Sequence, residues 1–309
     1  MIKVLIVASN NKGRFAPFVV EQADALRRCG CEVDYFGVTG KGVSGYLKNL
    51  SALKKRIREV QPSVIHAHYG LSGLLANLQR KVPVVTTYHG SDINDPKAFR
   101  FSKMALRKSA WNIFVSRGIM EKAKSMKKCS LIPCGVDVGA FQLFEKSSAR
   151  VKLYLSQEKK YVLFAGAFGN AVKNVLLAQN TIALLHDENV ELVELKGYSR
   201  NEVNLLLCAV DSLLVTSFNE GSPQVVKEAM ACGCPIVSVD VGDVRERLNG
   251  LEGCFVSQTY HPQELAELLQ KAFQQEGRTD GRKRLVDEGL DNCMIAKRLI
   301  EVYERVRHD

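Results

Sequence analysis

Short apolar runs alternate with amphipathic segments along the first half of the chain. The runs are rich in β-branched residues, which is typical of buried strands. They lie at residues 3–9, 32–36, 63–69, 82–89, 111–116 and 130–133. Apolar residues at helical spacing fill most of the intervals, as in residues 14–28 and 47–60. Continuous apolar strands joined by helices predict a parallel sheet that is covered on both faces.

The same rhythm begins again near residue 161. Strands are predicted in "YVLFAGAF", "VELVELKG", "DSLLVTS", "CPIVSVD" and "GCFVS", with helices between them. We therefore predict an α/β fold of two tandem doubly wound, Rossmann-like domains with an interdomain cleft. The first domain is expected to span residues 1–150 and the second 151–290, with a polar linker near 141–157. A last helix over about 291–309 is expected to pack back on the first domain.

Ligands of open parallel sheets bind beyond the carboxyl ends of the strands. This rule selects six short segments of the chain as candidates for a binding site. They are residues 10–14, 66–69, 88–92, 167–173, 217–224 and 241–243. His66 is expected in the core, whereas His68 and Tyr69 are candidates for the lining of the cleft.

Composition narrows the class of protein. The chain has 309 residues, of which 46% are hydrophobic and 25% charged, as in ordinary globular proteins. The opening "KVLIVAS" is too short for the core of a secretory signal and reads as a first strand, so we expect a cytoplasmic protein. Nine cysteines occur without a CxxC pair, and no Asp-x-Asp occurs, so no metal site and no cofactor are expected.

The positive charge is concentrated in the first half. Residues 1–145 hold 23 Lys and Arg against 10 Asp and Glu, and residues 146–309 hold 20 against 23, which gives +13 and −3 of the total +10. The basic clusters "KNLSALKKRIRE", "KAFRFSKMALRKS" and "EKAKSMKKCS" contain no alternating aromatic residues, which disfavours a nucleic acid. An anionic membrane surface is the more natural partner, and a plain solvated helix face is the alternative.

Two carboxylates frame one predicted helix start. In "NEGSPQVVKEAMACGCP", Glu220 and Glu228 are eight residues apart. Ser222 suits an N-cap and Pro223 the first helical position, so the following N–H groups would favour an anion. Two acids would repel a bare phosphate but suit a ligand with both a diphosphate and sugar hydroxyls. Lys173 is able to supply the opposing positive charge.

Several segments together resemble one enzyme family. They are residues 211–248, "PSVIHAHYG", "PVVTTYHGSD", "LIPCGVD" and "FAGAF" followed by "VKN". These segments resemble the retaining glycosyltransferases of the GT-B fold that carry a Glu-x7-Glu motif (glycosyltransferase family 4, group 1). They occur in the same order as in that family and cover nearly the whole chain.

The resemblance implies a role for each matched residue. Glu228 is similar to the acid that binds the ribose of the nucleotide, and Glu220 to the acid that contacts the donor sugar. Lys173 resembles the lysine that neutralises the diphosphate, and His89 a histidine near the donor sugar. Gly13 resembles the glycine of the first loop, which admits donor and acceptor. The diphosphate and sugar would also be held by the loop and helix start at Gly221, Ser222, Pro223, Gln224 and Val225.

Three positions depart from the family pattern. Ala167 stands where an Arg is usual, so one phosphate-binding cation is missing, and Lys12, Arg14 and Lys227 are the replacements available. Ser222 and Pro223 replace an aromatic residue and a glycine, which removes one N–H donor. The first loop reads "NNKGRF" in place of a double glycine.

The resemblance implies transfer of a sugar from a nucleoside diphosphate sugar to an acceptor hydroxyl, with retention and without a metal. The acceptor is expected to be a lipid-linked or polysaccharide intermediate, met by Lys12, Arg14, His68 and Tyr69. The basic first domain would then lie peripherally at the cytoplasmic membrane face. Two alternatives stay open: a catalytically silent nucleotide-sugar-binding subunit, and a GT-B nucleotide-sugar epimerase or hydrolase.

Overall fold

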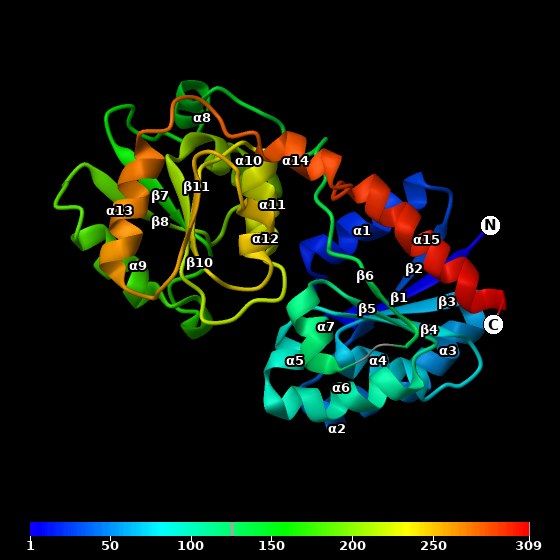
Figure 1. The fold of residues 1–309 in the computed structure, drawn as a ribbon. Coiled ribbons are helices and arrows are strands. Elements are labelled where there is room, and N and C mark those ends of the chain that lie inside the picture. Colours follow the sequence, from blue (N-terminus) through cyan, green and yellow to red (C-terminus); the bar gives the residue numbers. More distant parts are fainter. Residues whose placement is uncertain (125–126, 309) are drawn as a thin grey trace. The chain divides into compact units, whose positions relative to one another are not determined.

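The computed structural model describes residues 1–124 and 127–308, and it divides into two compact units (Figure 1). Unit 1 comprises Met1–Gly135 and Leu290–Asp309, and unit 2 comprises Val136–Gly289. Each unit holds a parallel sheet with helices packed on it. The prediction of two doubly wound, Rossmann-like units is therefore confirmed.

Unit 1 is built on a six-stranded sheet in the order β2-β1-β3-β4-β5-β6. All of its strand pairs are parallel. The strands are β1 (Lys3–Ser9), β2 (Glu32–Val38), β3 (Val64–His68), β4 (Val84–Tyr88), β5 (Trp111–Phe114) and β6 (Cys129–Leu131). Each overlaps one of the predicted apolar runs. The strand order reverses between β1 and β3, which makes the carboxyl ends of these strands the expected ligand-binding edge.

The helices of unit 1 cover both faces of its sheet. They are α1 (Pro17–Arg28), α2 (Gly42–Leu47), α3 (Leu50–Val60), α4 (Gly70–Asn77), α5 (Ser91–Asn94), α6 (Pro96–Lys108), α7 (Arg117–Ala123) and α15 (Asn292–His308). Leu5 and Ile65 pack in a core cluster with Leu53 of α3 and Leu75 of α4. Strand side chains alternate between faces, so the neighbours of Ile65 point the other way. There α15 packs on α1 and β3, and Figure 1 shows it alongside α1.

Unit 2 is built on a five-stranded parallel sheet in the order β11-β10-β9-β7-β8. Its strands are β7 (Lys160–Phe164), β8 (Val190–Glu194), β9 (Ser212–Val215), β10 (Ile236–Val239) and β11 (Cys254–Ser257). Its helices are α8 (Lys146–Lys152), the 3-10 turn η1 (Ala171–Lys173), α9 (Val175–Ala183), α10 (Arg200–Ala209), α11 (Gln224–Ala231), α12 (Val244–Leu248), α13 (Pro262–Phe273) and α14 (Gly281–Asp287). Here the order reverses between β7 and β9, which selects the loops after these two strands.

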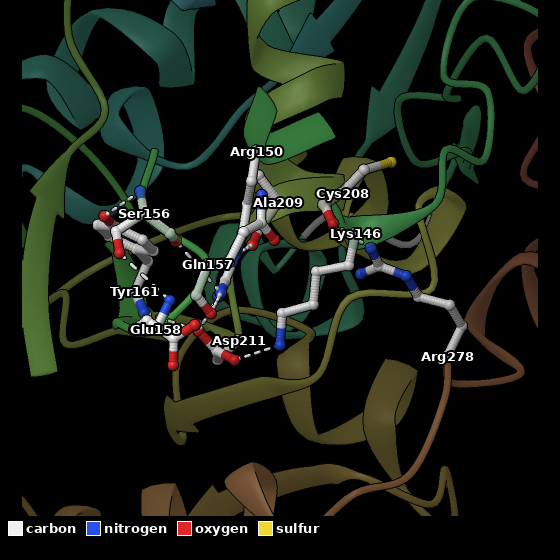
Figure 2. Close-up of polar contacts among 10 residues, drawn as sticks. All are labelled: Lys146, Arg150, Ser156, Gln157, Glu158, Tyr161, Cys208, Ala209, Asp211 and Arg278. Carbon is white, nitrogen blue, oxygen red and sulfur yellow. Dashed lines mark hydrogen bonds and ion pairs between the residues drawn. The ribbon is translucent and has the colours of Figure 1, made fainter. Parts of the chain in front are cut away.

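The boundary between the units lies at Gly135, not at residue 150 as the sequence suggested. The expected linker contains α8, and polar contacts hold this helix on unit 2 (Figure 2). The Arg150 guanidinium, whose residue is 4% exposed, donates to the Ala209 carbonyl at 2.9 Å and to Asp211 Oδ2 at 2.7 Å. Asp211 also accepts from Lys146 and from the Tyr161 backbone N–H. These contacts make residues 141–157 part of unit 2.

Candidate functional site

Lys173 and Glu220 form an ion pair at the carboxyl edge of the sheet of unit 2. Lys173 ends η1 after β7, and Glu220 lies in the loop after β9, so both follow the strands at which the order reverses. Lys173 Nζ donates to Glu220 Oε1 at 2.7 Å, with side chains 20% and 17% exposed. The pair therefore brings together a predicted phosphate-binding cation and a predicted sugar-binding acid, both reachable from solvent.

The backbone around Lys173 is fixed by two neighbours. A Cβ at Gly166 would lie 2.8 Å from Lys173 Cγ, so only glycine leaves room for the lysine side chain to cross the strand end. Thr216 Oγ1 donates to the carbonyl of Lys173 at 2.8 Å and so ties the loop after β7 to the loop after β9. Lys173 is thus held in place by local packing, which favours a positioned charge over a mobile surface lysine.

Glu228 is held by a residue that the sequence analysis missed. It lies on α11, is 4% exposed, and its Oε1 accepts from Arg200 Nη2 at 2.9 Å. Arg200 is the first residue of α10 and lies between Ser199 and Glu202, which form a capping box. Its guanidinium lies 4.7 Å from the centre of the Phe141 ring. Nothing in the spacing of the sequence links these residues, because Arg200 and Glu228 are 28 positions apart.

The start of α11 differs from the prediction by one residue. The N-cap is Pro223 and the helix begins at Gln224, so Ser222 does not cap it. Ser222 Oγ donates to Asp243 Oδ2 at 2.8 Å and accepts from Lys227 Nζ at 2.9 Å. A serine hydroxyl that is already bonded to a carboxylate beyond β10 is not available for the backbone N–H groups of the helix.

The other predicted donor-site residues lie in the same loop and on the first turn of α11. Gly221 and Pro223 are buried between β9 and α11, and Val225 is 9% exposed on the first turn of α11. Because Pro223 has no N–H, the donors of the helix start begin with Gln224. Lys227 is 1% exposed and bonded to Ser222, so the suggestion that it replaces the missing phosphate cation is wrong.

Three histidines stack at the carboxyl edge of the sheet of unit 1. The rings of His66 and His68 lie 4.6 Å apart, and those of His68 and His89 lie 5.3 Å apart. His68 Nδ1 and His89 Nε2 are hydrogen-bonded at 3.0 Å. His66 is fully buried, as predicted, and bonds to Tyr303 of α15 at 2.6 Å and to Thr87 at 2.7 Å.

His68 lies behind His89, not at the acceptor side. Its side chain is fully buried, so the direct contact with an acceptor expected from the sequence is not available to it. His89 is half-buried and is flanked by Phe18 and Tyr69, with ring centres at 4.8 and 4.5 Å. Burial lowers the pKa of His68 to about 3, so this ring stays neutral and fixes the orientation of His89.

The backbone beside these histidines is unusual. Tyr69 has φ 72° and ψ 150°, a conformation that is costly for any residue except glycine. Asp92 supports the neighbouring turn, because its carboxylate accepts from the N–H groups of Gly70, His89 and Gly90, each at 3.0 Å. Burial raises the pKa of Asp92 to about 6, against the opposite effect of these N–H groups. Tyr69 and His89 are thus held rigidly at the strand ends.

The neutrality of buried His68 predicts an acid-sensitive unit 1. Below pH 6.5 this histidine is protonated in the unfolded chain but stays neutral in the folded one. His68 should therefore lower the unfolding free energy by about 1.4 kcal/mol for each pH unit below 6.5. Asp92 acts in the opposite direction, since its raised pKa adds stability as the pH falls from about 6 towards its ordinary value.

The variant His68→Gln should therefore lose about 1.4 kcal/mol less than the wild type between pH 7.5 and 5.5. Urea unfolding followed by fluorescence measures this in unit 1 alone, because the single Trp of the chain, Trp111, lies in β5. Equal losses in both proteins would show that His68 is not the group that responds.

The first loop carries the remaining predicted residues. Gly13 has φ 70° and its N–H donates to the Asn10 carbonyl at 3.0 Å, so the loop turns tightly after β1. Lys12, Gly13 and Arg14 are all exposed. Within residues 1–124 and 127–308, no cluster of three or more His, Cys, Asp or Glu side chains is arranged to hold a metal ion.

Basic residues also gather on α6 and α7. A cavity of about 570 Å³ between these helices is lined by Phe99 and Leu106 and by the cations Lys103, Arg107, Lys122 and Lys124. The third basic cluster of the sequence reaches residues 125 and 126, which lie outside the described residues. In the part of the chain that is described, every helix is too short or too polar to span a bilayer.

Two family models match the chain, one for each half. Residues 2–140 match Glycosyltransferase Family 4, and residues 181–275 match Glycosyl transferases group 1. Among curated proteins, the chain is 27% identical over 216 residues to TuaC of Bacillus subtilis (strain 168), a glycosyltransferase assigned to teichuronic acid biosynthesis; the match covers 60% of this chain and 55% of TuaC. It is 23% identical to the D-inositol 3-phosphate glycosyltransferase of Nocardioides sp. (strain ATCC BAA-499 / JS614), over 88% of this chain and 74% of that protein.

Solved structures show the same architecture. Sucrose-phosphate synthase from Thermosynechococcus elongatus superposes with a TM-score of 0.84 at 17% identity, over 99% of both chains. HepE from Anabaena, in complex with UDP and glucose, superposes with a TM-score of 0.79 at 17% identity, over 98% of this chain and 100% of that one. This likeness shows the GT-B fold. The two family models, which match residues 2–140 and 181–275, identify the chain: it belongs to the glycosyltransferases of family 4 and group 1.

Proposed function

We propose that the protein transfers a sugar from a nucleoside diphosphate sugar to an acceptor hydroxyl, with retention at the anomeric carbon and without a metal ion. The observation that carries the proposal is the Lys173–Glu220 ion pair beside the first turn of α11. It supplies a positive charge for a leaving diphosphate and an acid for sugar hydroxyls within one group of loops. The complex of HepE with UDP and glucose supports this ligand class by analogy.

The chemical task is to stabilise the charge that builds up on the departing diphosphate. Lys173 and the N–H groups from Gln224 onward would do this with fixed groups, which need no reorganisation during the reaction. Position 167 carries an alanine, so the usual arginine is missing there. Arg200, a second cation of unit 2, lies beside Glu228 and is better placed to supply this charge than Lys227, which is buried. Glu220 would hold the donor sugar while the acceptor hydroxyl approaches the same face.

Glu228 would bind the ribose hydroxyls of the nucleotide. Its carboxylate is buried and oriented by Arg200, so the variant Glu228→Gln loses a charged acceptor and weakens the orienting contact. We expect nucleoside diphosphate binding to weaken at least tenfold, since a hydrogen bond to a charged group contributes about 1.5–3 kcal/mol. Calorimetry with UDP, GDP and ADP checks this. Glu267→Gln, on the exposed side of α13, is the control, and an equal loss in both variants would contradict the assignment.

The acceptor proposed here is a lipid-linked or polysaccharide intermediate, and the place of action is the cytoplasmic face of a membrane. The cations around the cavity between α6 and α7, with apolar Phe99 and Leu106 at its wall, suit an anionic lipid surface. Co-sedimentation at low salt should show binding to anionic but not zwitterionic vesicles, and Lys103→Glu with Arg107→Glu should abolish it. Wild-type protein that ignores anionic vesicles would remove the membrane from the proposal.

A silent nucleotide-sugar-binding subunit is the second candidate, and the alanine at position 167 favours it. Release of nucleoside diphosphate from a panel of donors, with and without membrane extract, separates the candidates. Release only with acceptor supports transfer, release without acceptor supports an epimerase or hydrolase type of activity, and binding without any release supports the silent subunit.

A further inference from the structure

Two cysteines from opposite ends of the chain meet on unit 1, away from the residues assigned above. Cys29 Sγ and Cys293 Sγ lie 3.9 Å apart, although 264 positions separate the two residues. Both are free thiols in the structure. Sulfur atoms at this distance are in contact, so rotation of the two side chains is what a disulfide bond of about 2.05 Å still requires.

Regular secondary structure holds the backbone of both cysteines. Cys29 is the C-cap of α1, and its N–H donates to the Ala25 carbonyl at 3.0 Å. Cys293 is the second residue of α15, and its N–H donates to Asp291 Oδ1 at 3.0 Å. The two helices pack against each other, as Figure 1 shows. The fold therefore keeps the two thiols together.

The two thiols differ in their access to solvent and in their electrostatic surroundings. Cys293 is exposed and lies in the first turn of a 17-residue helix, where backbone N–H groups favour a thiolate. Cys29 is partly buried at the carboxyl end of α1, where the helix dipole disfavours a negative charge. Burial raises the pKa of the Cys29 thiol, as does its contact with Cys293, whereas the charges of Lys297 and Arg28 lower this pKa. Cys293 is therefore the thiol that an oxidant reaches first.

We propose that Cys29 and Cys293 form a reversible disulfide bond by exchange with a small disulfide such as oxidised glutathione. The Cys293 thiolate attacks one sulfur of the small disulfide, which forms a mixed disulfide and releases one thiolate. The Cys29 thiolate then attacks Cys293 Sγ, which forms the protein disulfide and releases the second thiolate. Two protein thiols are thereby oxidised and one small disulfide is reduced to two thiols, which take up the two protons that the cysteines lose.

The bond would fasten α15 to unit 1. The chain leaves unit 1 at Gly135 and returns to it at Leu290, shortly before Cys293. A disulfide would join the first turn of α15 to the end of α1, in addition to the packing that already holds this helix. A crosslink that spans most of the chain strongly restricts the unfolded state. Oxidation should therefore suppress the local opening of α15, whether or not the protein transfers a sugar.

Oxidised glutathione is the probe, and peptide mass spectrometry without a reductant is the first measurement. The wild type should yield a peptide pair that joins Cys29 to Cys293, and dithiothreitol should separate the pair. In Cys29→Ser the second thiol is missing, so glutathione should stay attached to Cys293. Hydrogen exchange of the amides of α15 is the second measurement. Oxidation should slow this exchange at least tenfold in the wild type and leave it unchanged in Cys29→Ser.

Cys31→Ser is the matched control, because Cys31 is two positions from Cys29 and is 8% exposed. It also removes one thiol, but it should form the disulfide as the wild type does. Melting temperatures of the reduced variants separate the loss of the bond from a loss of the fold. The proposal is overturned if the folded wild type gives no linked peptide, if the link uses Cys31 or joins two chains, or if exchange in α15 does not slow.

Discussion

Turnover of the sugar donor is expected to fall about 100-fold in the variant Lys173→Ala. The lysine ammonium is placed against Glu220 and is the cation that the proposed function assigns to the leaving diphosphate. Removal of one such preorganised group typically costs about two to three orders of magnitude in rate. Release of nucleoside diphosphate from the preferred donor measures the effect. The decrease should appear in kcat, because the charge on the diphosphate grows in the transition state.

Lys196→Ala is the matched control for this experiment. Lys196 is an exposed lysine of the same unit, so its removal changes the net charge equally. Turnover close to that of the wild type in Lys173→Ala, with its melting temperature lowered, would mean that the Lys173–Glu220 pair is a structural ion pair. The site would then have to be sought elsewhere in the chain.

Removal of the Asp211 carboxylate should lower the unfolding free energy of unit 2 by about 3 kcal/mol. The side chain of Arg150 is 5% exposed, and Figure 2 shows it beside Asp211. In Asp211→Ala it keeps its charge but loses this carboxylate partner. The Tyr161 N–H loses its acceptor as well. Native-state hydrogen exchange of amides in β7 and β9 measures this quantity within unit 2.

Glu191→Ala provides the comparison. Glu191 pairs with Lys159 at 3.0 Å, but both side chains are about half exposed, so its loss should cost less than about 1 kcal/mol. A similar small change in Asp211→Ala would show that the three carbonyl contacts of Arg150 are sufficient to hold α8 on unit 2.

The strands were predictable because both faces of a parallel sheet are buried. Central strands such as β1 and β9 then read as nearly unbroken apolar runs, whereas the edge strands β2 and β8 carry charged residues among the apolar ones. The position of Lys173 and Glu220 was predictable for a related reason: the ends of such strands share one edge of the sheet. The contact that orients Glu228 was not predictable, because Arg200 and Glu228 are far apart in the sequence and meet only in the folded chain.

Two errors have identifiable physical causes. The domain boundary was placed at residue 150 because polar residues follow one another there, whereas long-range contacts of Arg150 and Asp211 decide to which unit α8 belongs. His68 was assigned to the acceptor side as a strand-end residue. It is two positions from His66 and therefore shares its face of β3, which is the face that α15 covers.

The position of α15 in the chain has a consequence for biosynthesis. Tyr303 closes over His66, and the buried residues of this helix lie against α1 and β3. On the ribosome, all the strands of unit 1 emerge before α15, with the whole of unit 2 made in between. The apolar face that α15 covers is exposed during that interval. Unit 2 is therefore able to complete its fold before unit 1, although it is synthesised second.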